Sequence, residues 1–507
     1  MSLNQIKGGA ILSYVSMIFG NIIVLLYTPF MLRSLGSSEY GIYSICNTVG
    51  SSIAMLDAGF GIAAVKYIVR DKSNKEKLPY TLGTLMLVNF CLGVVAFVLA
   101  GSFSAVSDTF YGESMTLQEL HSLKIILWLT SIYLTITFMV SVFPAVVVAY
   151  ERFIFIKVVD ICKSFLLPLI IVPFLLCGYK AIAMSLITLL VFLGVNIVKI
   201  IYALTHLKIK ISFKRIDTDL LKQALSFAGL IVLKLILERV YWSGGQLVLG
   251  VVSGTLAVAI FALALQISGY YNFVAQAVNY MFLPRCTELY EKNDIKGLSD
   301  LFLKVSRIQT MILGVILCVF CVFGSLFVQL WAGEEYLEAY YCCLIIMIPY
   351  TIPLAQGIGN SILQASNKLG FQTIVFVLIS IFAIFASWFL GKEYGAIGCS
   401  IAISMCIIVG EIVCMNIYYK KMGIDINSFW RNIVSISIPL VLCTVIFFSI
   451  QYVIKGFGWM YFLLMSSSMS LILVMGLYCC SMNLSEKNLL NISLNKVSKL
   501  LHNKKTR

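Results

Sequence analysis

Long apolar stretches, separated by short polar segments, run along nearly the whole chain. About 20 helical residues cross the hydrocarbon core of a bilayer, and each stretch is of about that length. The stretches are continuously apolar rather than alternating, which favours helices over the strands of a membrane barrel. The pattern predicts an all-α integral membrane protein with about 14 transmembrane helices. We place them at residues 9–30, 41–65, 81–105, 123–149, 155–176, 179–203, 224–249, 254–282, 305–330, 340–365, 371–390, 394–417, 432–454 and 458–480.

Composition narrows the class of protein further. The chain has 507 residues, of which 60% are hydrophobic and only 12% are charged, so the predicted helices leave no room for a soluble domain. The 15 cysteines follow no disulfide or metal-ligand spacing, and we expect no metal site. A short polar start leads into a full-length apolar stretch without a small-residue cleavage site, so we expect the first helix to be retained.

The positive charges predict an orientation. In the connections between the apolar stretches and at the ends of those stretches, 28 Lys and Arg residues fall on the side of the two termini and 5 fall on the other side. Under the positive-inside rule both termini are therefore cytoplasmic. The net charge of +14 is dispersed over the inner loops and the two ends, which favours contact with anionic membrane lipid over binding of nucleic acid. The five outer residues are Arg33, Lys124, Lys180, Lys392 and Lys455.

The chain also repeats itself at an offset of 215 to 218 residues: 35–43 resembles 254–261, 149–155 resembles 365–371, and 179–185 resembles 394–400. The offset covers an even number of helices, so the copies enter the membrane in the same direction and are related by a pseudo-two-fold axis along the membrane normal. Two such lobes leave a cavity that can open alternately to each side, as in a transporter. The predicted parts are a first six-helix lobe (1–203), a cytoplasmic linker (204–223), a second six-helix lobe (224–417), two further transmembrane helices (418–480) and a basic cytoplasmic tail (481–507).

Three short motifs carry a resemblance to a known family. The string Tyr27-Thr-Pro-Phe-Met-Leu-Arg-Ser-Leu-Gly-Ser-Ser-Glu-Tyr-Gly-Ile-Tyr43 resembles the first-helix signature of bacterial polysaccharide flippases of the Wzx type. Asp57-Ala-Gly-Phe-Gly61 and Ala149-Tyr-Glu-Arg-Phe153 are similar to further patterns of these proteins. They belong to the multidrug/oligosaccharidyl-lipid/polysaccharide exporter superfamily, and the resemblance covers essentially the whole chain. The motifs define fold and family better than substrate.

The resemblance implies a MATE-like fold and a flippase that moves undecaprenyl-diphosphate-linked oligosaccharide repeat units across the bacterial cytoplasmic (inner) membrane by alternating access. Such a protein serves surface polysaccharide biosynthesis, for example of O-antigen. The implied partners are the lipid-linked oligosaccharide, anionic lipid and other membrane proteins of polysaccharide assembly. No cofactor is implied apart from a coupling Na⁺ or H⁺.

Two alternatives stay open. Relatives in the same superfamily export drugs or metabolites with Na⁺ or H⁺, and the general physics of the chain is compatible with that activity. A membrane glycan polymerase would need catalytic residues on an outer loop. The longest expected outer connection, residues 106–122, holds a single histidine (His121) and no catalytic constellation, and the chain has no phosphate-binding loop of the P-loop type. We therefore expect a protein that is not an enzyme.

Ionisable residues inside the predicted helices are the candidate site, because a charge in the bilayer is costly unless it faces a cavity or a partner. Arg239 has no obvious partner in its own helix and is expected to face the central cavity, where a guanidinium suits a lipid diphosphate. Lys234 is expected to assist it, and Glu238 stands one turn further, where it can pair with Lys234. Asn21 takes the position of Arg239 under the offset of 218.

Other ionisable residues inside the predicted helices are further candidates for the site. Asp57 is a candidate for the cavity or for coupling to an ion or proton, and Glu411 is a candidate coupling site. Asp160 and Lys163 are spaced for an internal pair in one helix, and Lys199 is expected to extend towards the interface. Arg33 is expected at the outer mouth. If Arg239 is not the diphosphate site, the candidates that remain are Lys163, Lys199 and Arg33.

Overall fold

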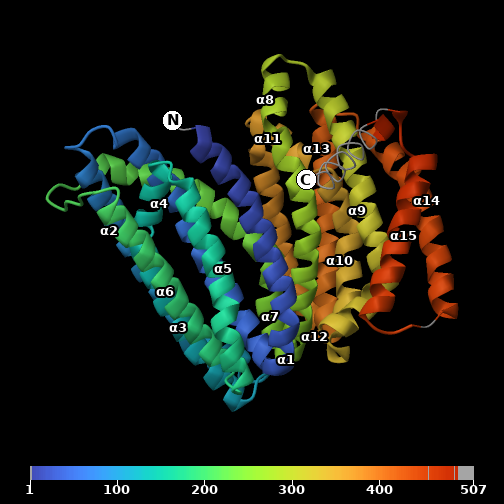
Figure 1. Ribbon diagram of the computed structural model, residues 1–507, viewed down its shortest axis with the longest axis horizontal. Helices are drawn as coiled ribbons and strands as arrows, with labels where there is room; N and C mark the ends of the chain where they lie inside the picture. The colour runs from blue at the N-terminus through green and yellow to red at the C-terminus, as the bar shows by residue number, and fades with distance from the viewer. Residues whose placement is uncertain (1–2, 455, 485, 489–507) are drawn as a thin grey trace, which may run out of the picture. The chain divides into compact units, whose positions relative to one another are not determined.

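The computed structural model describes residues 3–454, 456–484 and 486–488, and this part of the chain is helical with no strand (Figure 1). The prediction of an all-α fold is confirmed. The elements are α1 (Leu3–Asp71), α2 (Leu78–Tyr111), α3 (Leu117–Val140), α4 (Val142–Ala149), α5 (Phe153–Leu176), α6 (Ala181–Thr205), α7 (Thr218–Asn279), η1 (Tyr280–Phe282), α8 (Leu283–Glu291), α9 (Ile295–Trp331), η2 (Glu334–Tyr336), α10 (Glu338–Ala355), α11 (Ile358–Ala365), α12 (Leu369–Cys406), the π-helix η3 (Ile407–Cys414), α13 (Met415–Lys421), α14 (Ile426–Val453) and α15 (Trp459–Cys480).

Three of the long helices contain one glycine whose backbone leaves the helical region. Gly36 in α1 has φ 76°, Gly254 in α7 has φ 77°, and Gly395 in α12 has φ 55°. Positive φ suits glycine because a Cβ would clash there. At each of these places the sequence predicts two spans joined by a loop, whereas the structure has a kink. Among the described residues 11 helices are long and apolar enough to cross a membrane. Three of them contain these kinks, which is consistent with the predicted number of spans.

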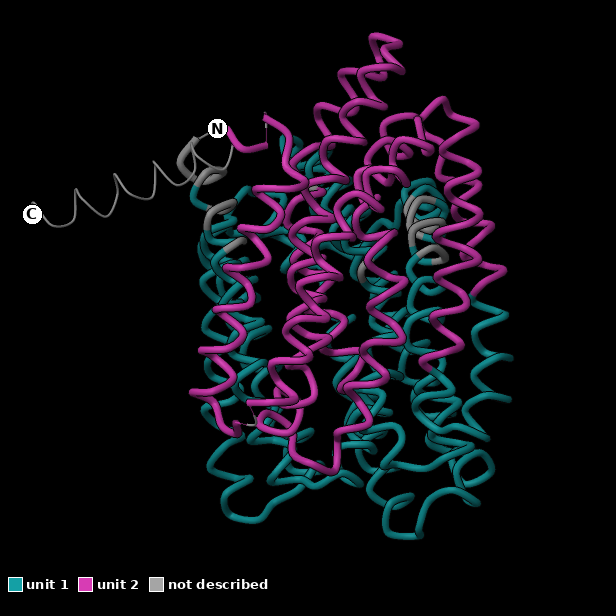
Figure 2. The backbone as a smooth tube through the Cα atoms, turned by 90° about the vertical axis from the view of Figure 1, so that its right-hand side faces the viewer, with its two compact units in different colours: residues 1–262, 380–399 teal, residues 263–379, 400–507 magenta. Residues whose placement is uncertain are grey.

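By its internal contacts the chain divides into two compact units. Unit 1 comprises residues 1–262 and 380–399, and unit 2 comprises residues 263–379 and 400–507 (Figure 2). The predicted lobe boundaries at 203 and 224 are based on the sequence repeat, whereas the two units are defined by contacts between residues. The two divisions therefore need not coincide. Superposition of 1–203 on 224–417 stays a prediction.

Unit 1 has a core where α1, α2, α4 and α6 meet. Ile68, Leu82, Val146 and Ala203 are fully buried there. At the opposite end of the same helices, Glu119 in the first turn of α3 joins three elements. One of its carboxylate oxygens accepts hydrogen bonds from Ser38 of α1 and, at 2.8 Å, from Thr255 of α7. The first part of α7 is therefore fixed against α1 and α3.

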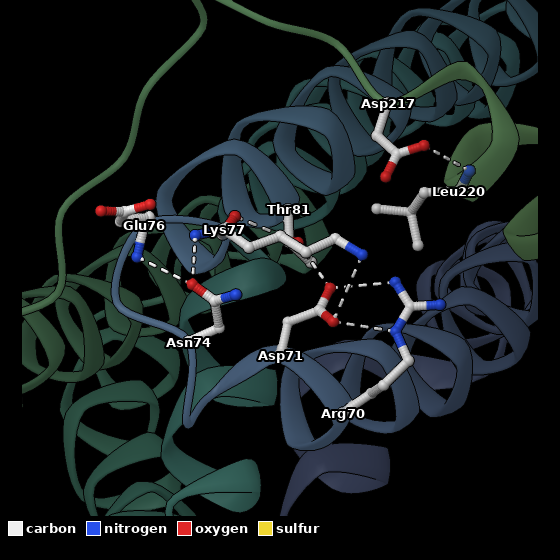
Figure 3. Close-up of polar contacts among 8 residues, drawn as sticks. All are labelled: Arg70, Asp71, Asn74, Glu76, Lys77, Thr81, Asp217 and Leu220. Atoms are coloured by element: carbon white, nitrogen blue, oxygen red, sulfur yellow. Dashed lines mark hydrogen bonds and ion pairs between the residues drawn. The ribbon is translucent and has the colours of Figure 1, made fainter.

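The corner between α1 and α2 is organised around one buried carboxylate (Figure 3). Asp71 accepts hydrogen bonds from Nε and Nη2 of Arg70, both at 2.9 Å, and from the Thr81 hydroxyl at 2.7 Å. The Lys77 ammonium lies 3.7 Å from the same carboxylate. These hydrogen bonds and nearby positive charges offset the cost of burying the Asp71 carboxylate, because an unpaired buried carboxylate would destabilise the fold.

The segment between α6 and α7 lies against the first turns of α2. The Ser212 N–H donates to the Pro79 carbonyl at 3.0 Å, and the Asp217 N–H donates to the Thr84 hydroxyl at 3.1 Å. The Asp217 side chain then accepts from the N–H of Leu220 at 2.9 Å in the first turn of α7 (Figure 3). The predicted linker is thus attached to the first helical bundle.

Unit 2 holds its C-terminal segment through a buried ion pair. Arg307 of α9 donates from Nε to Glu486 at 2.8 Å and from Nη1 to Asn432 of α14 at 2.9 Å. Burial acts to raise the pKa of the Glu486 carboxyl, but the hydrogen bonds from Arg307 and from the Asn483 N–H outweigh burial and hold that pKa below its usual range. The residues after α15 are thereby tied to α9 and α14 as far as the described chain extends.

The backbone repeats at the offset found in the sequence. The eight-residue helices α4 and α11 correspond at an offset of 216, and positive φ follows each, at Glu151 and Asn367. Next to these turns, Phe155 stacks on Tyr202 at 3.7 Å between ring centroids, and Phe371 stacks on Tyr418 at 4.3 Å, again at an offset of 216. The kinks at Gly36 and Gly254 agree with an offset of 218.

Candidate functional site

Arg239 lies in α7 and is partly exposed. Its Nη2 donates to the hydroxyl of Ser51 in α1, while its Nε is buried without a hydrogen-bond partner in the described part of the chain. No carboxylate of the described residues lies within 4.0 Å of its guanidinium. A buried guanidinium nitrogen that lacks an acceptor is free to bind an anion, since an anion supplies both charge and acceptor atoms.

The structure gives fewer contacts for the other residues that the sequence grouped with Arg239. The Lys234 side chain lies outside the described residues, so its pairing with Glu238 stays a prediction, and the Glu238 side chain is exposed. Asn21, at the position equivalent to Arg239, donates its amide to the Met17 carbonyl of its own helix at 2.8 Å. Arg33 is exposed.

A charged cavity of about 420 Å³ lies within unit 1 between α1, α3, α4, α5 and α6. We define it by Asp57, Lys163, Asn196 and Lys199, which contribute its charged and amide groups. The Oδ1 atom of Asp57 is buried and has no hydrogen-bond partner among the described residues. The sequence analysis identified Asp57, Lys163 and Lys199 singly and missed Asn196, and it did not place them around one cavity.

The ion pairing in this cavity differs from the sequence expectation. Asp160 pairs with Lys199 of α6 at 3.1 Å, and the predicted pair with Lys163 is wrong. Lys163 instead places its ammonium 4.5 Å from the centre of the Phe192 ring, a cation–π contact, and no described carboxylate is within ion-pair distance. Lys163 therefore supplies a positive charge to the cavity wall.

A hydroxyl cavity of about 220 Å³ lies between α1, α3 and α6, also within unit 1. Six of its 13 lining residues carry a hydroxyl, and none of the 13 carries a charge. The six are Tyr43, Ser51, Thr130, Tyr133, Ser185 and Thr188. Ser51, the acceptor for Arg239, belongs to this wall, and Tyr133 lines the charged cavity as well. Serine and threonine are common in membrane helices, so the sequence carried no signal for this site.

A third, carboxylate cavity of about 50 Å³ lies in unit 2 and includes Glu411. Glu411 stands in the π-helix, a rare irregularity that often marks functional positions. Gln356 and Asn360 share the lining, and the amide of Gln372 donates to Asn360 at 2.6 Å. The Oε1 atom of Gln356 is buried without a hydrogen-bond partner among the described residues. One carboxylate with several amide oxygens is a donor set that suits a small hard cation or a proton.

The charged and carboxylate cavities occupy equivalent places in the two copies of the repeat. At the offset of 216, Val195 of the charged cavity corresponds to Glu411, and Lys199 corresponds to Met415. The first copy therefore has a valine where the second copy has its carboxylate, and a lysine where the second copy has a methionine.

Comparison with known proteins identifies the class first. The chain has the fold of a solved lipid II flippase, MurJ, in an inward closed conformation (TM-score 0.69, 14% identity, covering 92% of this chain and 97% of that one). It is similar in fold to an inward-facing multidrug resistance MATE family transporter of the MOP superfamily (TM-score 0.67, 14% identity, covering 80% of this chain and 94% of that one). These likenesses confirm the predicted MATE-like fold.

The family follows from the sequence. Residues 30–341 match the family model described as "Polysaccharide biosynthesis protein", and the chain belongs to this family. A relative from Escherichia coli (strain K12), described as "Putative O-antigen transporter", is 22% identical over 417 residues, which cover 78% of this chain and 94% of the relative. The resemblance to the polysaccharide branch of the superfamily is thus confirmed.

Proposed function

We propose that this chain is a flippase for lipid-linked oligosaccharide in surface polysaccharide biosynthesis. The observation that carries the proposal is the match to the polysaccharide biosynthesis family over residues 30–341. The relative described as an O-antigen transporter and the fold of a lipid II flippase support the same substrate class. The chain then acts as a transporter rather than as an enzyme, in the bacterial cytoplasmic (inner) membrane.

Within this proposal the lipid diphosphate is bound by cationic side chains of unit 1. Arg239 has a buried nitrogen without an acceptor, and Lys163 has no carboxylate partner among the described residues. A diphosphate carries only acceptor atoms and negative charge, which suits each of these two groups. Lys234, five residues earlier in α7, assists Arg239 in this proposal.

An ion-coupled exporter of drugs or metabolites is the second candidate function. The carboxylate cavity around Glu411 favours coupling to Na⁺ or H⁺, and the fold resembles that of a multidrug transporter. Asp57 is the corresponding candidate in unit 1, because its buried Oδ1 is left without a partner in the described chain. Coupling at these residues is compatible with a flippase as well.

Deletion of the gene tests the substrate class. We expect loss of surface glycan together with accumulation of its lipid-linked precursor in the cytoplasmic membrane, both reversed by the wild-type gene. Immunoblotting of surface glycan and mass spectrometry of extracted lipids measure the two effects. Normal surface glycan together with raised drug sensitivity would instead favour the exporter.

The proposed orientation is tested by labelling. In a variant without cysteines, Lys75→Cys and Lys210→Cys should stay unmodified when intact spheroplasts are treated with a membrane-impermeant maleimide, because both exposed residues belong to the predicted cytoplasmic face. Lys180→Cys, also exposed but predicted to be outside, is the matched control and should be labelled. Labelling of the first two variants and protection of the third would reverse the orientation.

A further inference from the structure

Three of the six hydroxyls that line the hydroxyl cavity already donate their protons to backbone carbonyls of their own helices. Thr130 donates to the Ile126 carbonyl at 2.8 Å, Ser185 to the Ala181 carbonyl at 2.9 Å, and Thr188 to the Met184 carbonyl at 2.8 Å. A hydroxyl has one proton and two lone pairs. Each of these side chains therefore presents only acceptor capacity to the cavity.

This pattern selects a ligand by its hydrogen-bond donors. A phosphate or carboxylate offers only acceptors, so it gains little from these three hydroxyls. A small cation would need a tight oxygen cage, and about 220 Å³ is far larger than the ~10–15 Å³ that one water-sized occupant requires. A neutral polyol carries many O–H donors, and it fits a cavity of this size and chemistry.

The surroundings of the cavity agree with a sugar ring. Tyr43 and Tyr133 contribute aromatic rings, whose faces can pack on the apolar face of a sugar, and Asn47 contributes an amide that both donates and accepts. No lining residue carries a charge, which disfavours an acidic sugar. Arg239 lies next to this wall, because its guanidinium donates to the Ser51 hydroxyl.

The hydroxyl and charged cavities follow one another along the same helices. In α6, residues 185–189 line the first and residues 192–199 line the second, and Tyr133 of α3 lines both. A sugar that is bonded directly to a diphosphate needs a neutral, acceptor-rich space beside a cationic one. The hydroxyl cavity is neutral, and the charged cavity beside it contributes Lys163, a positive charge without an ion-pair partner among the described residues.

We propose that the hydroxyl cavity is the binding site for the first sugar of the lipid-linked oligosaccharide, the sugar attached to the diphosphate, and that this sugar is uncharged. The proposal rests on the proposed flippase function and adds the residues that would recognise the saccharide. The hydroxyls of Ser185, Thr188 and Thr130 accept hydrogen bonds from the sugar while the diphosphate contacts Lys163 and Arg239.

The test compares two kinds of probe on the purified full-length protein in lipid nanodiscs. One is undecaprenyl diphosphate, and the other is undecaprenyl diphosphate carrying a single neutral sugar, with glucose, galactose or N-acetylglucosamine in turn. Microscale thermophoresis measures the affinity for each. We expect the wild type to bind one of the sugar-bearing lipids about tenfold more tightly than bare undecaprenyl diphosphate. Two or three additional hydrogen bonds to the sugar are sufficient for a difference of this size.

The double variant Ser185→Ala/Thr188→Val should remove this advantage and leave the affinity for bare undecaprenyl diphosphate within about twofold of wild type. The fold should persist, because each deleted hydroxyl bonds only to a carbonyl one turn back in α6. The control Ser164→Ala/Thr205→Val deletes two hydroxyls outside the cavity that also donate to a carbonyl one turn back, and it should keep the advantage; the Thr205 hydroxyl additionally contacts Nδ1 of His206 at 2.9 Å.

Two results would overturn the inference. If no sugar-bearing lipid binds more tightly than the bare lipid, or if the double variant keeps the advantage, the hydroxyl cavity does not recognise sugar, although diphosphate binding and the flippase proposal stand. If the wild type binds neither kind of lipid, the flippase proposal fails together with the inference.

Discussion

Arg239→Ala is expected to abolish export of surface glycan without lowering the amount of protein in the membrane. The desolvated diphosphate requires positive charge as well as hydrogen-bond donors, and alanine supplies neither. Each charge-assisted hydrogen bond contributes about 1.5–3 kcal/mol, so loss of two corresponds to about a hundredfold or more in affinity. Arg239→Gln should behave like Arg239→Ala. Immunoblots of surface glycan and of the protein in isolated membranes give the two readouts.

Arg239→Lys should retain partial export, because charge is kept while the planar donor geometry of the guanidinium is lost. Arg215→Ala is the matched control, since Arg215 is exposed in the segment before α7 and should be dispensable. Normal transport by Arg239→Ala at normal expression would mean that Arg239 is structural or faces lipid. The diphosphate site would then be among Lys163, Lys199 and Arg33.

Gly41→Ala is expected to lower the stability of unit 1 by about 1–3 kcal/mol, because overpacking a close contact has a cost of this size. A Cβ on Gly41 in α1 would overlap the backbone carbonyl of Thr255 in α7, and a backbone carbonyl cannot rotate away as a side chain can. Thermal unfolding of the purified protein, followed by intrinsic fluorescence, measures the effect.

Gly20→Ala is the matched control in the same helix. A Cβ there meets no atom within 4 Å, so the substitution should be neutral or slightly stabilising, as alanine is a better helix former than glycine. Equal stability of the two variants would contradict the close approach of α1 and α7 at Gly41.

The helices could be predicted from the sequence because apolar length alone determines whether a segment crosses a bilayer. The junctions at Gly36, Gly254 and Gly395 could not. A polar interruption such as residues 34–40 predicts a loop, yet a single glycine with positive φ is enough to redirect the chain while both sides stay helical. The internal repeat was visible because short motifs recur at nearly one offset, and the turns that follow α4 and α11 share a positive φ at Glu151 and Asn367 although the residue types differ.

For the site, the sequence identified the charged groups but assigned one partner incorrectly. Spacing along one helix reports only neighbours on that helix, so Asp160 appeared to pair with Lys163, whereas Lys199 of α6 lies closer in space. The hydroxyl cavity has no local signature at all. Its oxygen atoms come from three helices and meet only when α1, α3 and α6 pack together.

The equivalence of Val195 with Glu411, and of Lys199 with Met415, bears on how such proteins diversify. The two copies carry an aliphatic group or a carboxylate, and an ammonium or a thioether, at matching places, although Val195 stands in the α-helix α6 and Glu411 in the π-helix η3. A repeated scaffold thus allows the two halves to share an architecture while their side-chain chemistry differs. A point substitution in one half can change which substrate is bound while the other half keeps its role. Related proteins can therefore differ in substrate specificity and still share one helical fold.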